Sequence, residues 1–172
     1  MKRAPLALAI LLALVPASSA ETGAEAELSR FSGKPVPRFE TLRWAEVNGR
    51  VGPSLSYPIA WRYNRKGLPV LVVKESGEWR RVRDPAGDEV WVHDRMLASG
   101  PMAMVTETTM LFDAPARDAA SLAEVGEGVL VEVERCDNAL CRVRAGSFRG
   151  WIARAKLWGT APPEGPQTAT NG

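Results

Sequence analysis

The stretch WRRVRDPAGDEVWVHDRML, residues 79–97, is repeated later in the chain as LCRVRAGSFRGWIARAKLW, residues 140–158. In both copies an Arg-Val-Arg triplet is followed, after a turn, by a tryptophan and an aliphatic residue. The upstream segments also match, KGLPVLVVKESGE at residues 66–78 with GEGVLVEVERCDN at residues 126–138. Each copy spans about 55–60 residues, which is too long for a solenoid unit and long enough for a small barrel.

Each copy reads as short strands joined by turns. In the first copy, strands are expected over residues 70–74 and 79–83 around ESGE, a connection typical of a hairpin, and over residues 89–93 after the turn DPAGD. In the second copy the expected strands cover residues 129–136, 141–144 and 148–153. No window holds a helical stripe, since the nearest, residues 118–126, is short and ends at Gly126. The pattern predicts an all-β fold with a short linker over residues 99–103.

The first 20 residues predict a secretory signal peptide. Lys2 and Arg3 precede an apolar run over residues 6–15, and small residues precede the expected cleavage site after Ala20. This run is shorter than the roughly 18 residues of a membrane helix, and no other run approaches that length. We therefore expect a periplasmic or secreted protein whose mature form has no membrane span.

The two ends of the mature chain differ from its middle. Residues 21–40 are expected to form an extended lead segment, because Pro35 and Pro37 disfavour a helix. Residues 159–172 are rich in Pro, Gly and Thr, and we expect a disordered tail there.

The charge balance argues against a nucleic-acid partner. The chain has 22 Lys and Arg against 20 Asp and Glu, and the signal peptide contains two of the basic residues and no acidic one. The mature chain is therefore balanced at 20 against 20. A protein of zero net charge has no general electrostatic attraction to DNA or RNA.

The basic strand WRRVR has two distinct faces. Alternation along a strand places Trp79, Arg81 and Arg83 on one face, and Arg80 and Val82 on the other. We expect Val82, like Val143 in the second copy, to face the core, and Trp79 to pack beside the guanidinium of Arg81. The outer face is then either a solvated strand surface or a platform for a ligand.

A second alternating set lies in WRYNR, where Trp61, Tyr63 and Arg65 fall on one side of the expected strand. Aromatic side chains with polar tips suit the binding of peptides or sugars. The same residues could equally fill the interior of a barrel.

The segment CDNALC holds both cysteines of the chain, Cys136 and Cys141. A nucleophilic cysteine needs a histidine to take its proton, and the single histidine, His93, lies in the other copy, where we expect it to cap a strand end. A metal site needs about four ligands. Export favours oxidation, so we expect a Cys136–Cys141 disulfide across a hairpin tip, and no catalytic residue, metal or cofactor.

Several motifs together resemble the bacterial SH3-type family, SH3b. They are VNGRVGPS at residues 47–54, YPIAWRY at 57–63, RKGLPV at 65–70, WRRVRD at 79–84 and VWVHDRML at 90–97. With the PVPRF segment at residues 35–39 they are similar to exported Gram-negative proteins with tandem SH3-like domains. The resemblance implies two small SH3-like β-barrels, module 1 over residues 41–99 and module 2 over residues 103–158. It also implies non-catalytic binding of cell-wall peptide, glycan or a protein partner.

The family's Asn-x-Arg-x-Gly-Pro turn is better preserved in module 1. It is present there as Asn48, Arg50, Gly52 and Pro53, whereas module 2 has Met110, Phe112, Ala114 and Pro115 at these positions. The Gly-Trp pair that the family has late in each module is Gly150-Trp151 in module 2 but Val90-Trp91 in module 1. We therefore expect module 1 to bind a ligand and module 2 to be mainly structural.

These observations lead to one functional expectation and one alternative. We expect an exported, non-catalytic protein whose module 1 recognises cell-wall peptide, peptidoglycan or an extended peptide, through Trp61, Tyr63, Arg65, Trp79 and Arg81. The alternative is a structural or assembly factor that binds a periplasmic protein partner.

Overall fold

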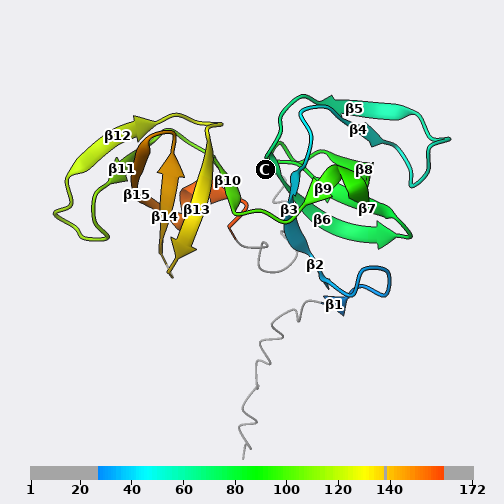
Figure 1. The fold of residues 1–172 in the computed structure, drawn as a ribbon, viewed down its shortest axis with the longest axis horizontal. Coiled ribbons are helices and arrows are strands. Elements are labelled where there is room, and N and C mark those ends of the chain that lie inside the picture. The colour runs from blue at the N-terminus through cyan, green and yellow to red at the C-terminus, as the bar shows by residue number, and fades with distance from the viewer. Residues whose placement is uncertain (1–26, 138, 161–172) are drawn as a thin grey trace, which may run out of the picture.

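The computed structural model describes residues 27–137 and 139–160. The predicted signal peptide, the first part of the lead segment and the tail beyond residue 160 lie outside the described residues. The described chain forms two small β-barrels that lie next to each other (Figure 1). This confirms the predicted all-β fold.

Module 1 is a seven-stranded antiparallel sheet with the strand order β5-β4-β8-β7-β6-β3-β9. Its strands are β3 (Arg38–Leu42), β4 (Val47–Arg50), β5 (Ile59–Tyr63), β6 (Pro69–Ser76), β7 (Trp79–Arg83), β8 (Glu89–His93) and β9 (Leu97–Ala98). A 3₁₀ turn, η1 (Asp94–Met96), joins the last two. The core contains Val82, which is fully buried as expected.

Module 2 repeats this topology in the order β12-β11-β15-β14-β13-β10-β16. Its elements are β10 (Met102–Val105), β11 (Thr109–Phe112), β12 (Ser121–Val125), β13 (Leu130–Cys136), β14 (Leu140–Ala145), β15 (Phe148–Ala153), η2 (Arg154–Lys156) and β16 (Leu157–Trp158). Val143, the counterpart of Val82, is fully buried in this second core. The internal repeat in the sequence is thus a repeat of the whole barrel.

The end of the predicted lead segment belongs to the first barrel. Strand β3 begins at Arg38 and pairs with both β6 and β9, so the sheet of module 1 begins before residue 41. Pro37 has no N–H to donate, and from Arg38 onward each backbone N–H group is available to a sheet. Upstream, β1 (Glu27–Leu28) and β2 (Pro35–Val36) form a separate two-stranded ribbon.

Side chains of β10, β13 and β16 in module 2 contact module 1. The indole Nε1 of Trp158 donates to the carbonyl oxygen of Pro69 at 3.1 Å, and its ring meets Phe39 edge-on with centroids 5.0 Å apart. Met104 and Leu130 of module 2 pack against the core of module 1. These contacts cover the part of the first barrel that faces its neighbour.

Candidate binding site

Exposed apolar side chains gather on one ribbon of module 1. Strands β4 and β5 pair antiparallel, and the loop between them is closed by a hydrogen bond from Val51 N to Pro58 O of 3.1 Å. Five large apolar residues within this stretch are exposed: Val51, Leu55, Tyr57, Ile59 and Trp61. We call residues 47–63 the β4–β5 ribbon; β5 forms one edge of the sheet (Figure 1). Since large apolar side chains usually lie inside, such a group is a candidate contact surface.

Two residues of the family's turn motif shape the loop of this ribbon. A Cβ on Gly52 would lie 2.6 Å from ring atoms of Tyr57, so only glycine lets this ring pack on the backbone. The guanidinium of Arg50 donates to the carbonyl oxygen of Tyr57 at 2.7 Å. Pro53 is half-buried beside them, whereas Asn48 is exposed. Arg50 and Gly52 therefore present Tyr57 and the loop, rather than forming a contact surface of their own.

Tyr63 is part of the core of module 1. Its side chain is buried, and its hydroxyl donates to Oδ2 of the buried Asp84 at 3.2 Å. Burial, with the adjacent charge and hydrogen bond of Asp84, raises the pKa of the Tyr63 phenol well above its usual range. Oδ1 of Asp84 accepts from the backbone N–H groups of Ala86 and Asp88, which fixes the DPAGD turn. The structure thus gives Tyr63 a structural role, beneath the ring of Trp61 at 6.5 Å between centroids.

The side chain of Arg65 reaches the neighbouring barrel. Its Nη2 donates to the carbonyl oxygen of Gly128 at 2.6 Å. Of the alternating set in WRYNR, Trp61 and Tyr63 are therefore in contact, while Arg65 bonds to module 2. The sequence of module 1 alone contains no signal for this contact.

Trp79 and Arg81 lie on the outer face of β7, because Arg80 and Val82 are buried on the other. The structure does not show the expected packing of the Trp79 ring beside the Arg81 guanidinium. Arg81 Nε instead pairs with Glu89 Oε2 at 2.7 Å, and the Trp79 ring meets His93 edge-on at 5.3 Å. Opposite charge on the next strand attracts the guanidinium more strongly than an indole does.

The predicted aromatic residues do not form one surface. Trp61 lies on the same face of β5 as Tyr63, but Tyr63 is buried in the core whereas Trp61 is exposed beyond its edge. Trp79 faces outward on β7. Of the five residues proposed from the sequence, two lie on the β4–β5 ribbon, and of these the side chain of Trp61 is exposed and that of Tyr63 is buried.

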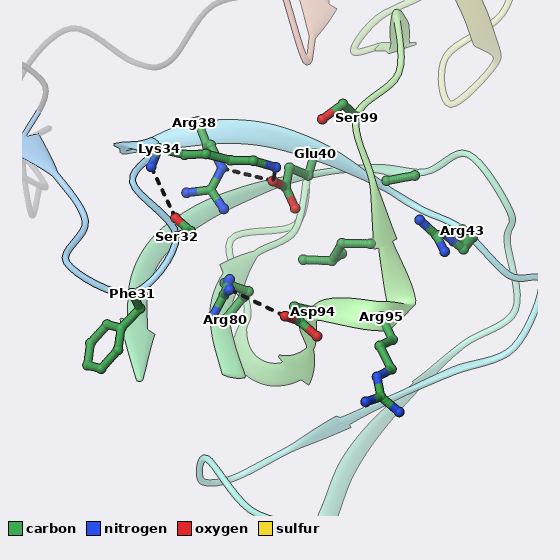
Figure 2. A pocket seen from close by; sticks show the side chains of 12 residues that line it. Phe31, Ser32, Lys34, Arg38, Glu40, Arg43, Arg80, Asp94, Arg95 and Ser99 are labelled. Atoms are coloured by element: carbon green, nitrogen blue, oxygen red, sulfur yellow. Dashed lines mark hydrogen bonds and ion pairs between the residues drawn. The ribbon is translucent and has the colours of Figure 1, made fainter. Parts of the chain in front are cut away.

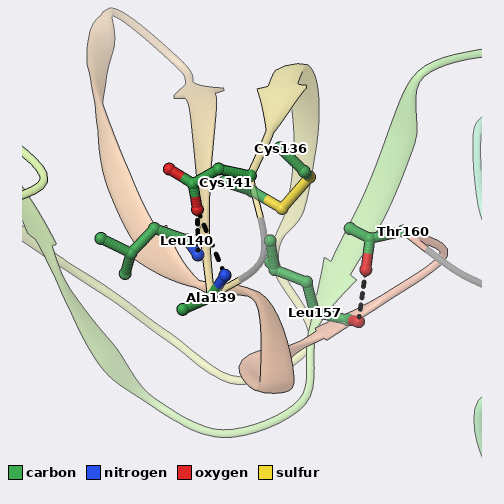
Figure 3. Close-up of a disulfide and its surroundings, with 7 residues drawn as sticks. Cys136, Ala139, Leu140, Cys141, Leu157 and Thr160 are labelled. Atoms are coloured by element: carbon green, nitrogen blue, oxygen red, sulfur yellow. Dashed lines mark hydrogen bonds between the residues drawn. A yellow bond between two sulfur atoms is a disulfide. The ribbon is translucent and has the colours of Figure 1, made fainter.

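His93 and the cysteines have the structural roles that the sequence indicates. His93, at the end of β8, caps η1 by accepting the Arg95 N–H on its Nδ1 at 3.3 Å. Cys136 and Cys141 form a disulfide between directly paired positions of β13 and β14, with Cα atoms 4.0 Å apart (Figure 3). Among the described residues no group of three or more His, Cys, Asp or Glu could hold a metal ion.

A buried ion network was missed from the sequence. The Glu75 carboxylate, 1% exposed, accepts from Arg38 Nη1 at 2.7 Å and lies 3.3 Å from Arg80 Nε. It also accepts hydrogen bonds from Ser29 and Ser32, which hold the lead segment against the barrel. Burial by itself raises the pKa of Glu75, but these hydrogen bonds and Arg80 outweigh burial, so the pKa lies below its usual range. The only signal in the sequence was the core-facing position of Arg80, which requires a buried partner.

Comparison with known families agrees with the architecture. The model of the bacterial SH3 domain matches residues 44–98 and again residues 105–159. The chain belongs to the bacterial SH3 domain family, with two domains in tandem. Among the described residues, no helix has the length and apolar character needed to cross a membrane.

Two solved structures share a limited likeness with the chain. NlpC2 from Trichomonas vaginalis has 13% sequence identity and a TM-score of 0.33, over 71% of this chain and 48% of the other. NlpC1 from the same organism has 14% identity and a TM-score of 0.34, over 77% and 48%. The chain thus spans about half the length of these two proteins. No curated protein matches it.

Proposed function

We propose that this protein is exported and non-catalytic, and that the β4–β5 ribbon of module 1 binds peptide or glycan of the cell wall. The observation that carries the proposal is the group of exposed apolar residues at positions 51–61. Bacterial SH3 domains are binding modules that commonly take cell-wall material, and both cysteines here are joined in a disulfide, so neither is a nucleophile.

The barrel does not require this apolar surface in order to fold. The corresponding loop of module 2, residues 113–120, reads DAPARDAA and contains no large apolar side chain. Its two strands expose only Phe112 and Leu122 among large apolar residues. The same fold therefore forms without the apolar loop, which supports a role in recognition for the loop of module 1.

The chemistry of the ribbon suits a ligand with both apolar and polar parts. Trp61 and Tyr57 offer flat apolar surfaces that pack on sugar rings or peptide side chains, and their N–H and O–H groups remain in reach of polar atoms. β5 also forms an edge of the sheet, where an extended segment of a protein can add as a strand. This second feature favours the alternative function, the holding of a periplasmic protein partner.

Sedimentation of the mature chain, from Glu21 onward, with isolated peptidoglycan tests the proposal. We expect the protein to enter the pellet at low and at high salt, because apolar contacts are little screened. Trp61→Ala and Tyr57→Ala should each reduce binding by about tenfold or more, as truncation of a central aromatic residue does. Phe148→Ala, which removes an equally exposed aromatic residue of module 2, is the matched control.

Other outcomes redirect the proposal. No sedimentation at either salt concentration would exclude wall binding and favour a protein partner, to be sought by crosslinking in the cell envelope. Equal loss with Phe148→Ala and Trp61→Ala would remove the ribbon as the site.

A further inference from the structure

A separate concave surface of module 1 lies between the lead segment and the barrel. It is a pocket of about 550 Å³, and Figure 2 shows the side chains that line it. One wall comes from the lead segment and β3, the other from Arg80 and the segment from η1 through β9. None of its lining residues belongs to the β4–β5 ribbon, so this surface is independent of the proposed wall-binding site.

The pocket has an excess of positive charge. Its lining contains five cationic residues and two acidic ones, namely Lys34, Arg38, Arg43, Arg80 and Arg95 against Glu40 and Asp94. Glu75, which bonds to Arg38 and Arg80, supplies one further negative charge. Glu78, which lies 4.0 Å from Arg95, supplies another, so an excess of one positive charge remains in a concave site, where charges attract a ligand more strongly than on an open surface.

Two of the arginines are not used by the fold. Arg38 and Arg80 are nearly buried and held by Glu40, Glu75 and Asp94. Arg43, in contrast, is exposed and has no ion pair among the described residues, while Arg95 is 77% exposed and only 4.0 Å from the equally accessible Glu78. Figure 2 shows both side chains away from the ion-paired group of Lys34, Arg38 and Glu40.

The pocket also runs along an edge of the sheet. Strand β9 ends the strand order of module 1 and pairs with β3 alone among the described strands. Leu97, Ala98 and Ser99 line the pocket, and Phe31 adds an apolar wall. Strand β9 has only two residues, and Leu97 N–H already donates to Asp94 O, so the edge open to extended peptide backbone is the short stretch at its end, next to Ser99. A simple anion such as phosphate offers no backbone to such an edge.

We infer that this pocket is a second ligand site, which binds an acidic segment of an extended peptide. The peptide lies along β9, and its carboxylates are bound by Arg43 and Arg95. Guanidinium groups match carboxylates with two parallel hydrogen bonds, and these are stronger than bonds between neutral groups.

NMR titration of ¹⁵N-labelled mature protein tests this inference with three probes: triglutamate, the neutral triglutamine and inorganic phosphate. Triglutamate should shift the Arg43 and Arg95 Nε–H signals and the amides of Ala98 and Ser99 saturably, more weakly at high salt. Triglutamine should not shift them. The double substitution R43Q/R95Q should lower the affinity for triglutamate at least about tenfold. Arg117→Gln, an exposed arginine of module 2, should leave it unchanged.

Shifts that do not saturate, that persist in R43Q/R95Q, or that phosphate reproduces at the same concentration would exclude an acidic-peptide site. Arg43 and Arg95 are exposed, so their substitution leaves the fold intact, as the unchanged amides of module 2 would verify. Trp61→Ala should retain triglutamate binding, which separates this test from that of the wall-binding ribbon.

Discussion

Gly49 on β4 faces Val90 on β8 so closely that a Cβ on Gly49 would lie 2.4 Å from Val90 Cγ2. Module 2 has the reverse arrangement, in which a Cβ on Gly150 of β15 would lie 2.7 Å from Cγ of Leu111 on β11. The pairing of Arg50 with Trp91, and of Phe112 with Trp151, shows that these strands correspond. The glycine missing before Trp91 in module 1 is therefore replaced by one on the neighbouring strand.

This reciprocal packing predicts that Gly49→Ala destabilises the protein by about 1–3 kcal/mol, because the stiff Val90 side chain cannot move aside. In urea denaturation followed by tryptophan fluorescence, G49A/V90A should lose less stability than the sum of its single substitutions. Gly126→Ala is the control, since its new Cβ would meet only Val129 Cγ2, at 3.9 Å. Additive effects of G49A and V90A would contradict the proposed exchange.

Glu75 should make the stability depend on acid pH. Its pKa is lower in the folded protein than in the unfolded chain, so its contribution is present above the unfolded pKa, about 4.3. It is lost as the pH falls through the folded pKa. Glu75→Gln removes the buried carboxylate that Arg38 and Arg80 share and leaves them only their outer partners Glu40 and Asp94, and we expect it to cost about 3 kcal/mol at neutral pH.

Urea titrations between acid and neutral pH would measure this effect. The Glu75→Gln protein should show a flatter dependence of unfolding free energy on pH than the wild type. Glu78→Gln, at a carboxylate that is 67% exposed, should change stability by no more than about 0.5 kcal/mol. If the Glu75→Gln protein keeps the wild-type dependence of unfolding free energy on pH, that dependence comes from other carboxylates.

Loss of the Cys136–Cys141 disulfide should destabilise module 2. The ring is small, since the cysteines are five residues apart, and loop-closure entropy predicts a loss of about 2 kcal/mol for C136A/C141A. Urea denaturation of this variant, compared with wild type with and without reductant, measures the effect. Modification of two thiols in the native, non-reduced protein would show instead that the cysteines are not joined.

Substitutions at Trp61 and Tyr63 should have opposite consequences. Tyr63→Phe removes the hydrogen bond to Asp84 within the core, and should reduce the unfolding free energy by about 1–2 kcal/mol without affecting retention by peptidoglycan. Trp61→Ala alters a side chain that is 52% exposed, and should affect retention far more than stability. Full stability together with lost retention in Tyr63→Phe would restore the ligand role predicted from the sequence.

The repeat made the fold predictable. The match of residues 79–97 with 140–158 placed β7, β8 and their counterparts β14 and β15 almost to the residue, because strand alternation and turn residues are local properties. The Cys136–Cys141 disulfide followed from spacing and the expected compartment, and the structure confirms it.

The candidate site was less predictable, because burial and partners at equivalent strand positions depend on tertiary contacts. Alternation correctly placed Trp61 and Tyr63 on one face, but it could not show that the core ends between them. Arg65 is bound by a carbonyl of the other module, a contact between residues that are 63 positions apart. The apolar loop residues Val51, Leu55 and Tyr57 followed no periodic pattern and were identified only by their exposure.

The indole of Trp158 is hydrogen-bonded to Pro69 and packed on Phe39, so the two modules are not independent domains joined only by a linker. Met104 and Leu130 complete the same boundary from the other side. A gene that lost its second copy would encode a first barrel with an uncovered apolar end. Recombination that exchanged one barrel for a homologue would have to preserve this boundary as well as the barrel itself.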